Sequence, residues 1–309
     1  MADRFRYHTL DVFTDRLLSG NPLALFSEAG GLDGAQMQAV ASEFNLSETV
    51  FILPPRDPAN VCALRIFTPR VELPFAGHPT VGAAHLLARL GRLPERPGLH
   101  FETLAGRVAV CPHVIEGALE IEIDSPVLPH QAALEIERGT TASILGLTEA
   151  DLHPHLPVAA FSAGVPLLFV PLRDLDTLAR CRLDLPAWAA RLRGTAGAHV
   201  YMFAERSPDA FRARMFAPAS GIAEDPATGG GALAFAGYLA ANGGAASPSG
   251  QCVWRIEQGI EMGRPSLLTL RADFDGGALV RASVAGGAVQ VMEGTINIPS
   301  SVEAYRESR

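Results

Sequence analysis

FAPASGIAEDPATGGGALAFAGYL, at residues 216–239, is the stretch from which the fold of this chain can be inferred. Asp225 and Pro226 are followed by three glycines, 229–231, and then by an apolar segment. Asp is favoured at a helix N-cap and Pro at the first helical position, so the pattern predicts the start of a helix. The glycines allow a ligand to approach backbone N–H groups, where the helix dipole favours an anion. The stretch therefore predicts an anion-binding loop that leads into a helix.

A second copy of this design occurs earlier, at residues 67–87, as FTPRVELPFAGHPTVGAAHLL. There His78-Pro79 takes the place of Asp225-Pro226. The helices expected after the two loops, 80–90 and 231–242, are apolar nearly all round, which is typical of helices buried in a core. Two such loops, one offering an imidazole and the other a carboxylate, predict a single active site built from two halves.

Two further landmarks recur in the same order along the chain. Residues 18–26 are echoed by 162–170, and residues 48–53 by 198–203. Together with the two loops, they predict an internal duplication at an offset of about 147 residues. The expected fold class is α+β, with two pseudo-symmetric lobes, each a barrel-like sheet around a central buried helix.

Short segments with strand-like patterning fill most of the remaining sequence, and a helix is expected at 33–44 between Asp33 as N-cap and Asn45 as left-handed stop. Ser125, Pro126 and Pro129 interrupt the pattern near the middle of the chain. We place the lobe boundary there. The N-terminal lobe is expected to comprise 1–128 with 294–309, and the C-terminal lobe 129–293, with the active site in the cleft between them.

Composition excludes several classes of function. The 309 residues are 48% hydrophobic and 19% charged, which suits about two packed domains, and the net charge of −8 without a basic cluster argues against nucleic acid. All 25 basic residues are Arg, so a Schiff-base lysine for pyridoxal phosphate is excluded. The four scattered cysteines predict neither a disulfide framework nor a thiolate metal site.

Motifs for cofactors, targeting and membranes are missing from the sequence. There is no phosphate-loop or dinucleotide-binding fingerprint, so no cofactor and no metal is expected. The polar N-terminus lacks the apolar core of a signal peptide, and no run of 18 apolar residues occurs. The protein is expected to be cytoplasmic, without membrane partners.

Glu48, His78 and Asp225 are the candidate catalytic residues. Glu48 begins a strand whose apolar surroundings are expected to raise its pKa, unless it is an edge glutamate in solvent. His78 and Asp225 could each serve only as helix caps, but their matching placement favours a shared site. A carboxylate base and a second acid suit proton abstraction and return at an activated carbon. Backbone N–H groups around Gly77, Gly229 and Gly230, with Thr228 beside them, suit a substrate carboxylate.

The chain resembles the phenazine-biosynthesis PhzF-like isomerase family over nearly its whole length. The resemblance is carried by DVFTDRLLSGNPLALF (11–26), NLSETVFI (45–52), RIFTPRVELPFAGHPTVGAAH (65–85), GIAEDPATGGGA (221–232) and QGIEMGRPS (258–266). It implies a diaminopimelate epimerase-like fold and a cofactor-independent isomerase, usually a homodimer. It also implies that Glu48 moves a proton between carbons of a small, carboxylated, cyclic or unsaturated substrate, aided by His78 and Asp225.

The sequence departs from the family pattern at one position. A serine often follows DPATG in the family, and here that position is Gly230, which leaves the substrate open. The cysteine pair of the related epimerases is missing from both loops, where the nearest cysteines are Cys62 and Cys252. Two alternatives stay open: a non-catalytic carboxylate-binding protein, and a racemase or epimerase that uses carboxylates in place of thiols.

Overall fold

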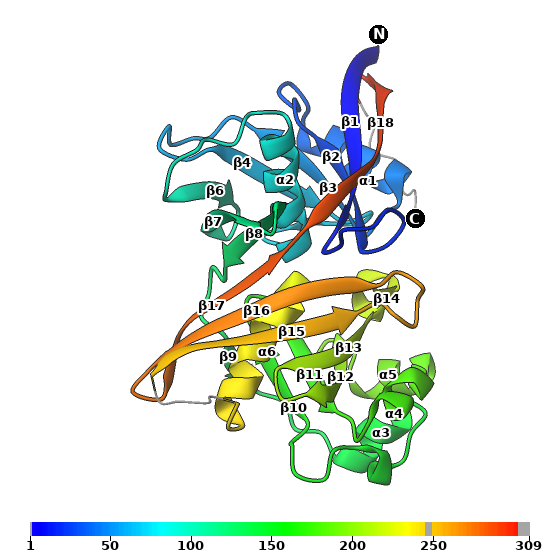
Figure 1. Cartoon of the computed structure of the whole chain (residues 1–309). Coiled ribbons are helices and arrows are strands. Elements are labelled where there is room, and N and C mark those ends of the chain that lie inside the picture. The colour runs from blue at the N-terminus through cyan, green and yellow to red at the C-terminus, as the bar shows by residue number, and fades with distance from the viewer. Residues whose placement is uncertain (1, 245–248, 302–309) are drawn as a thin grey trace.

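The computed structural model describes residues 2–244 and 249–301, and Figure 1 shows two lobes joined by long strands. The predicted lobe segments at residue 1, 245–248 and 302–309 lie outside the described part. The strands that come first in the chain are β1 (Ala2–Val12), β2 (Asn21–Phe26), β3 (Glu48–Leu53), β4 (Cys62–Phe67), β5 (Glu72–Leu73), β6 (Leu99–Thr103), β7 (Gly106–Ile115) and β8 (Ala118–Asp124). They are followed by β9 (His130–Ala132), β10 (Ala159–Ser162), β11 (Pro166–Pro171), β12 (Val200–Ser207), β13 (Ala210–Ala217), β14 (Ile222–Asp225), β15 (Gly250–Gln258), β16 (Ser266–Asp275), β17 (Ala278–Gly286) and β18 (Ala288–Pro299).

The helices are fewer and mostly short. They are α1 (Gly34–Phe44), α2 (Gly77–Arg89), α3 (Arg138–Ile144), α4 (Leu175–Arg180), α5 (Leu185–Arg191) and α6 (Gly229–Ala241), with 3-10 turns at Glu149–Asp151 and Pro218–Ser220. The predicted caps of α1 are confirmed. Asp33 accepts from the Gln36 N–H, and Asn45 ends the helix in the left-handed region at φ 50°.

Strand pairing repeats in the two lobes, as the duplication predicts. In the first lobe, β1 pairs antiparallel with β2, β2 parallel with β3, β3 antiparallel with β4 and β4 parallel with β6. In the second lobe, β10, β11, β12, β13 and β15 pair in the same order and with the same directions. The two lobes are therefore built on one pattern, which confirms the predicted α+β fold class.

Two long strands connect the lobes. Strand β17 pairs with β16 in the second lobe and with β8 in the first, and β18 returns to pair along β1 from Ala288 to Pro299. The predicted lobe boundary at 128/129 falls between β8 and β9, and the predicted return at 294 falls inside β18. Sheet hydrogen bonds therefore run without a break from one lobe into the other.

Each lobe wraps its strands around one buried helix, α2 in the first and α6 in the second (Figure 1). In α2 the first eleven residues are buried, and in α6 nearly every residue is buried from Gly229 to Leu239. A helix enclosed by a sheet must be apolar on all sides, which explains the absence of a polar stripe in either sequence. The prediction of two central buried helices is confirmed.

The predicted starts of these two helices were wrong by a few residues. Helix α2 begins at Gly77, so His78 and Pro79 lie in its first turn, and helix α6 begins at Gly229 with Thr228 at the N-cap. Asp225 is the last residue of β14 and does not cap the helix. The physical reason is that Asp225 bonds to side chains of other segments, which a local capping pattern cannot reveal.

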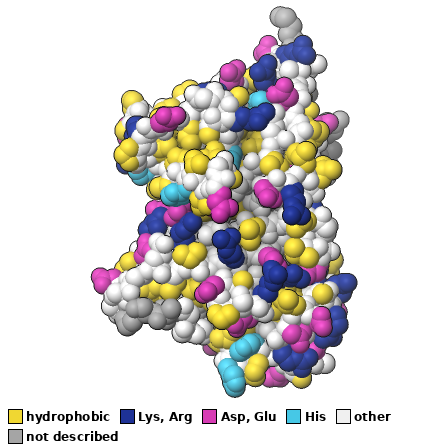
Figure 2. All heavy atoms as spheres, in the orientation of Figure 1, with side chains coloured by type: hydrophobic (Ala, Val, Ile, Leu, Met, Phe, Trp, Pro, Cys, Tyr) yellow, Lys and Arg dark blue, Asp and Glu magenta, His cyan; other side chains and the backbone are white. Residues whose placement is uncertain are grey.

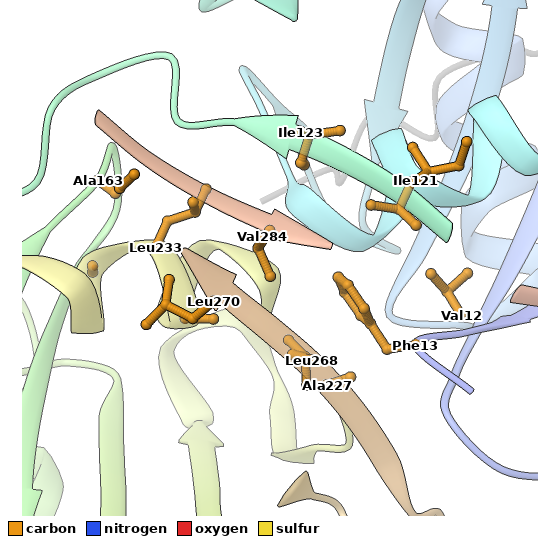
Figure 3. Close-up of a cluster of buried hydrophobic side chains, with 14 of the residues drawn as sticks. Val12, Phe13, Ile121, Ile123, Ala163, Ala227, Leu233, Leu268, Leu270 and Val284 are labelled. Carbon is orange, nitrogen blue, oxygen red and sulfur yellow. The ribbon is translucent and has the colours of Figure 1, made fainter. Parts of the chain in front are cut away.

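One hydrophobic core runs through both lobes. Figure 3 shows Phe13 and Ile121 of the first lobe beside Leu268 and Val284 of the second, and all four are nearly inaccessible to solvent. Smaller clusters lie under α1 in the first lobe and under α3, α4 and α5 in the second. The shared core fixes the two lobes against each other, and thus the two halves of any site between them.

The surface shown in Figure 2 carries acidic and basic side chains interspersed over both lobes. No helix among the described residues is long and apolar enough to cross a membrane. In the same part of the chain, no three His, Cys, Asp or Glu side chains gather in a way that could hold a metal ion.

Candidate active site

Glu48 lies at the start of β3, where the parallel register places it beside Leu23 of β2. Its exposed fraction is only 9%, so the alternative of an edge glutamate in solvent is wrong. Burial raises the pKa of Glu48 well above its usual value, and the nearby charge of Asp225 raises it further. Glu48 is therefore a carboxyl group that retains its proton more readily than a carboxyl group in water does.

His78, in the first turn of α2, lies directly beside Glu48. Its Nε2 is 3.3 Å from Oε2 of Glu48, and both side chains are almost fully enclosed. Burial lowers the pKa of His78 to about 3, so the imidazole is neutral at pH 7. Neither of these two atoms makes a hydrogen bond within the described residues. The pair is thus in contact, and the contact lacks hydrogen-bond geometry.

Asn21 lies between His78 and the second lobe. Its amide nitrogen donates to Oδ1 of Asp225 and to the carbonyl of Ala227, which uses both of its N–H groups. The same nitrogen lies 3.3 Å from Nδ1 of His78, a contact that does not fix which ring nitrogen carries the proton. Asn21 therefore brings the imidazole of the first lobe next to the carboxyl group of the second.

Asp225 enters the site from the second lobe at the end of β14. Asn21 donates to its Oδ1 at 2.8 Å, and the Thr228 hydroxyl donates to its Oδ2 at 2.5 Å. Burial raises the pKa of Asp225 to about 6, although these two hydrogen bonds act in the opposite direction. Asp225 is thus a second carboxyl group that titrates close to neutral pH.

Asn21 and Gln258 are two site residues to which the sequence analysis assigned no role. Asn21 crosses from the first lobe to Asp225 and Ala227. Gln258 is fully buried, donates to the Asp225 carbonyl and the Thr228 hydroxyl, and accepts from the Thr228 N–H. Both residues lie inside motifs that carry the family resemblance, SGNP and QGIEMGRPS, which was the available signal.

The N-termini of α2 and α6 meet at the centre of the molecule. A Cβ atom on Gly77 would lie 2.9 Å from the Gly229 Cα, and one on Gly229 would lie 3.1 Å from the Gly77 Cα. Such a close approach requires glycine at both positions. By contrast, a Cβ on Gly230 would meet no atom within 4 Å.

These residues enclose one cavity of about 170 Å³ between the lobes. All seven residues predicted for the site contribute to its wall, namely Glu48, Gly77, His78, Asp225, Thr228, Gly229 and Gly230. The remaining lining is mostly apolar, and it includes no Arg. Cys62 and Cys252 are not part of this wall. The structure thus brings the predicted residues together around one largely apolar cavity.

Comparison with known proteins agrees with this geometry. The family described as phenazine biosynthesis-like protein matches residues 10–294. The chain belongs to this family. An uncharacterized isomerase of Mesorhizobium japonicum is 42% identical, over 94% of this chain and 98% of that protein. The trans-2,3-dihydro-3-hydroxyanthranilate isomerase of Pseudomonas fluorescens is 36% identical, with the same two shares covered.

A solved structure extends the relationship to the fold. The phenazine biosynthesis protein of Bacillus anthracis, of the PhzF family, superposes with a TM-score of 0.87 at 26% identity, and 95% of this chain and 99% of that one are covered. The predicted diaminopimelate epimerase-like fold is confirmed. Several relatives, including the two above, are named isomerases, and this chain is an isomerase of that family.

Proposed function

We propose that the protein is a cofactor-independent isomerase that moves a proton between two carbons of a small carboxylated metabolite. The observation that carries the proposal is Glu48, a buried carboxyl group with a raised pKa on the wall of the cavity between the lobes, in contact with the neutral imidazole of His78. A group that exchanges protons with carbon works best when its pKa lies near the working pH.

In the proposed reaction, the C–H bond at the first carbon breaks and its proton passes to an oxygen of Glu48. The electron pair moves into the conjugated system of the substrate, and the Glu48 O–H bond breaks as a new C–H bond forms at the second carbon. Substrate and product are isomers, so no oxidant or reductant is consumed. The neutral imidazole of His78 lies beside Glu48, with Nε2 3.3 Å from Oε2, while that group takes up and returns the proton.

The size of the cavity supports a substrate with a single ring. An apolar protein cavity of about 150 Å³ holds one benzene molecule, and the cavity here is about 170 Å³. The substrate carboxylate would lie at the N-termini of α2 and α6, whose backbone N–H groups and dipoles favour an anion. No Arg side chain lines the cavity to take that role.

Solvent deuterium exchange tests the proposal. The probe is trans-2,3-dihydro-3-hydroxyanthranilate, which gives the Pseudomonas fluorescens relative its name. We expect the wild-type protein, incubated with this compound in deuterated water, to form an isomer that carries deuterium at a ring carbon. Binding without isomer and without exchange, for this compound and for related cyclic carboxylates, would instead favour a non-catalytic binding protein.

A racemase or epimerase is the second candidate, and one observation favours it. Glu48 and Asp225 come from opposite lobes, line the same cavity, and both have raised pKa values. Two carboxyl groups on either side of one carbon could remove a proton from one face and return it to the other. Chiral analysis of the product decides between the two reactions, because only the racemase inverts a single stereocentre and keeps the double bonds in place.

A further inference from the structure

His199 occupies the position in the second lobe that Glu48 occupies in the first, one residue later than the sequence echo of 48–53 by 198–203 predicted. In the first lobe, the parallel register of β2 and β3 places Glu48 beside Leu23. In the second lobe, β11 and β12 pair Leu168 with Val200, so the preceding residues, Leu167 and His199, are neighbours in the same way. His199 also lines the cavity that holds Glu48.

The His199 imidazole is neutral and has hydrogen-bonding capacity to spare. Burial lowers its pKa below the usual value for histidine. Its Nε2 lies 3.5 Å from the Ser220 hydroxyl, and its buried Nδ1 has no hydrogen-bond partner within the described residues. Buried polar atoms are nearly always paired, so the unpaired nitrogen shows that the protein does not satisfy the imidazole by itself. His199 is on the cavity wall, where a polar group of a ligand is the available partner for the ring.

Ser220 lines the same cavity and is held there by the 3-10 turn Pro218–Ser220. Together, His199 and Ser220 offer donor and acceptor groups without net charge. A second carboxylate on the ligand would need a cation at this place, and burial opposes the imidazolium form of His199. An uncharged hydroxyl or carbonyl group matches the pair.

We propose that His199 and Ser220 bind an uncharged polar substituent of the substrate, a hydroxyl or carbonyl group, and thereby determine which ring compounds the enzyme accepts. This assignment rests on the proposed function, in which the ring of the substrate fills the cavity. The duplicated backbone thus presents the proton-transferring carboxyl group from the first lobe and a specificity-determining imidazole from the equivalent place in the second.

A matched pair of stable ligands tests the assignment. The compounds 3-hydroxyanthranilate and anthranilate differ by a single hydroxyl group, and calorimetry gives the ratio of their Kd values. We expect the wild-type protein to bind the hydroxylated compound about 2- to 12-fold more tightly, the equivalent of one net neutral hydrogen bond. His199→Phe keeps a ring of similar size without nitrogen, and it should bring the ratio close to one while the affinity for anthranilate changes little.

Two further variants separate recognition from folding. His199→Gln, which retains an amide donor and acceptor, should restore part of the preference, and Ser220→Ala should reduce it. A preference unchanged in His199→Phe would overturn the assignment, as would an equal loss of affinity for both ligands or a wild-type protein that binds neither.

The outcome is distinguishable from a failure of the proposed function, because the Kd ratio requires no turnover. If deuterium exchange is absent and the ratio still depends on His199, the isomerase proposal fails and the binding assignment stands. If exchange occurs and the ratio is insensitive to His199, the binding assignment fails alone.

Discussion

The two lobes share a backbone pattern, but they place different side chains at equivalent positions. Glu48 at the start of β3 corresponds to His199 before β12. His78 in the first turn of α2 corresponds to Gly230 in α6, so the matching of His78-Pro79 with Asp225-Pro226 that the two sequence motifs predicted is wrong. Asp225, which pairs with Met215, corresponds to Leu73, which pairs with Ile66. The two lobes therefore provide similar backbone positions, and the acid–base side chains of the proposed site are distributed between them.

The division explains why neither lobe contains a complete site. Glu48, His78 and Asn21 come from the first lobe, and Asp225, Thr228 and Gln258 from the second. Asn21 links the two groups, because it contacts His78 and donates to Asp225. Its counterpart Val165 is an exposed apolar residue with no such capacity. The side chains thus differ between the lobes at four equivalent positions. The groups of the proposed acid–base site are therefore not related by the symmetry of the fold.

The largest expected effect comes from removing the acid of the first lobe. Glu48→Gln keeps the size of the side chain and abolishes proton transfer, so turnover should fall by about 10²–10⁴-fold. The assay is isomer formation on the substrate identified by deuterium exchange, with circular dichroism to verify folding. Glu43→Gln, at an exposed position on α1, is the matched control and should leave the rate unchanged. Full activity in Glu48→Gln would remove Glu48 from the mechanism.

The contact between the two helix N-termini is expected to tolerate no side chain from either lobe. Gly77→Ala places a Cβ 2.9 Å from the Gly229 backbone, and Gly229→Ala places one 3.1 Å from Gly77. Each variant should lose about 1–3 kcal/mol in the free energy of unfolding, as overpacked cores do. Urea denaturation measures the loss. Equal stability of wild type and both variants would show that the helices can separate without cost.

The pH dependence of stability should report the buried His78. Its pKa is about 3 in the folded state and 6.5 in the unfolded state, so between these values only the unfolded state binds the proton. Stability from this group is therefore complete above pH 6.5 and is lost as the pH falls. From pH 7 to pH 5, the wild type should lose about 2 kcal/mol relative to His78→Gln.

Denaturation at the two pH values measures this difference. The opposite trend from Asp225, whose pKa is raised to about 6, is present in both proteins and cancels to first order. A flat difference for His78→Gln would mean that His78 is accessible to solvent protons.

The smallest effect on folding is expected at Gly230, the counterpart of His78. A Cβ added at Gly230 would meet no atom within 4 Å. Gly230→Ala should therefore be neutral, or raise the free energy of unfolding by up to about 1 kcal/mol because alanine reduces the conformational entropy of the unfolded chain. Gly230→Ser restores the hydroxyl common in the family and adds a polar group to the cavity wall. Comparing the substrate range of the Ser and Ala variants isolates the contribution of that hydroxyl. A loss of stability in Gly230→Ala would contradict the finding that a Cβ at this position meets no neighbouring atom.

Patterns in the sequence were sufficient for much of this organisation. The caps Asp33 and Asn45 of α1 were predicted correctly because capping depends on neighbouring residues. The two buried helices were predicted because a helix enclosed by a sheet has to be apolar all round. The starts of α2 and α6 were missed by a few residues. For α6 the reason is that Asp225 bonds to Asn21, far away in the chain, and to the Thr228 side chain, and does not cap the helix.

By itself, the sequence determined the duplicated α+β fold, the two glycine-rich loops and the residues Glu48, His78 and Asp225, because these depend on local composition and on repetition along the chain. The tertiary structure alone decided the bonds that join them. Asn21 and Gln258 act through contacts to the loop around Asp225, and Asn21 also contacts the ring of His78. The equivalence of Glu48 and His199 also emerged only from strand register. Such long-range pairings leave no local pattern, since residues distant in the chain become neighbours only when the shared core closes.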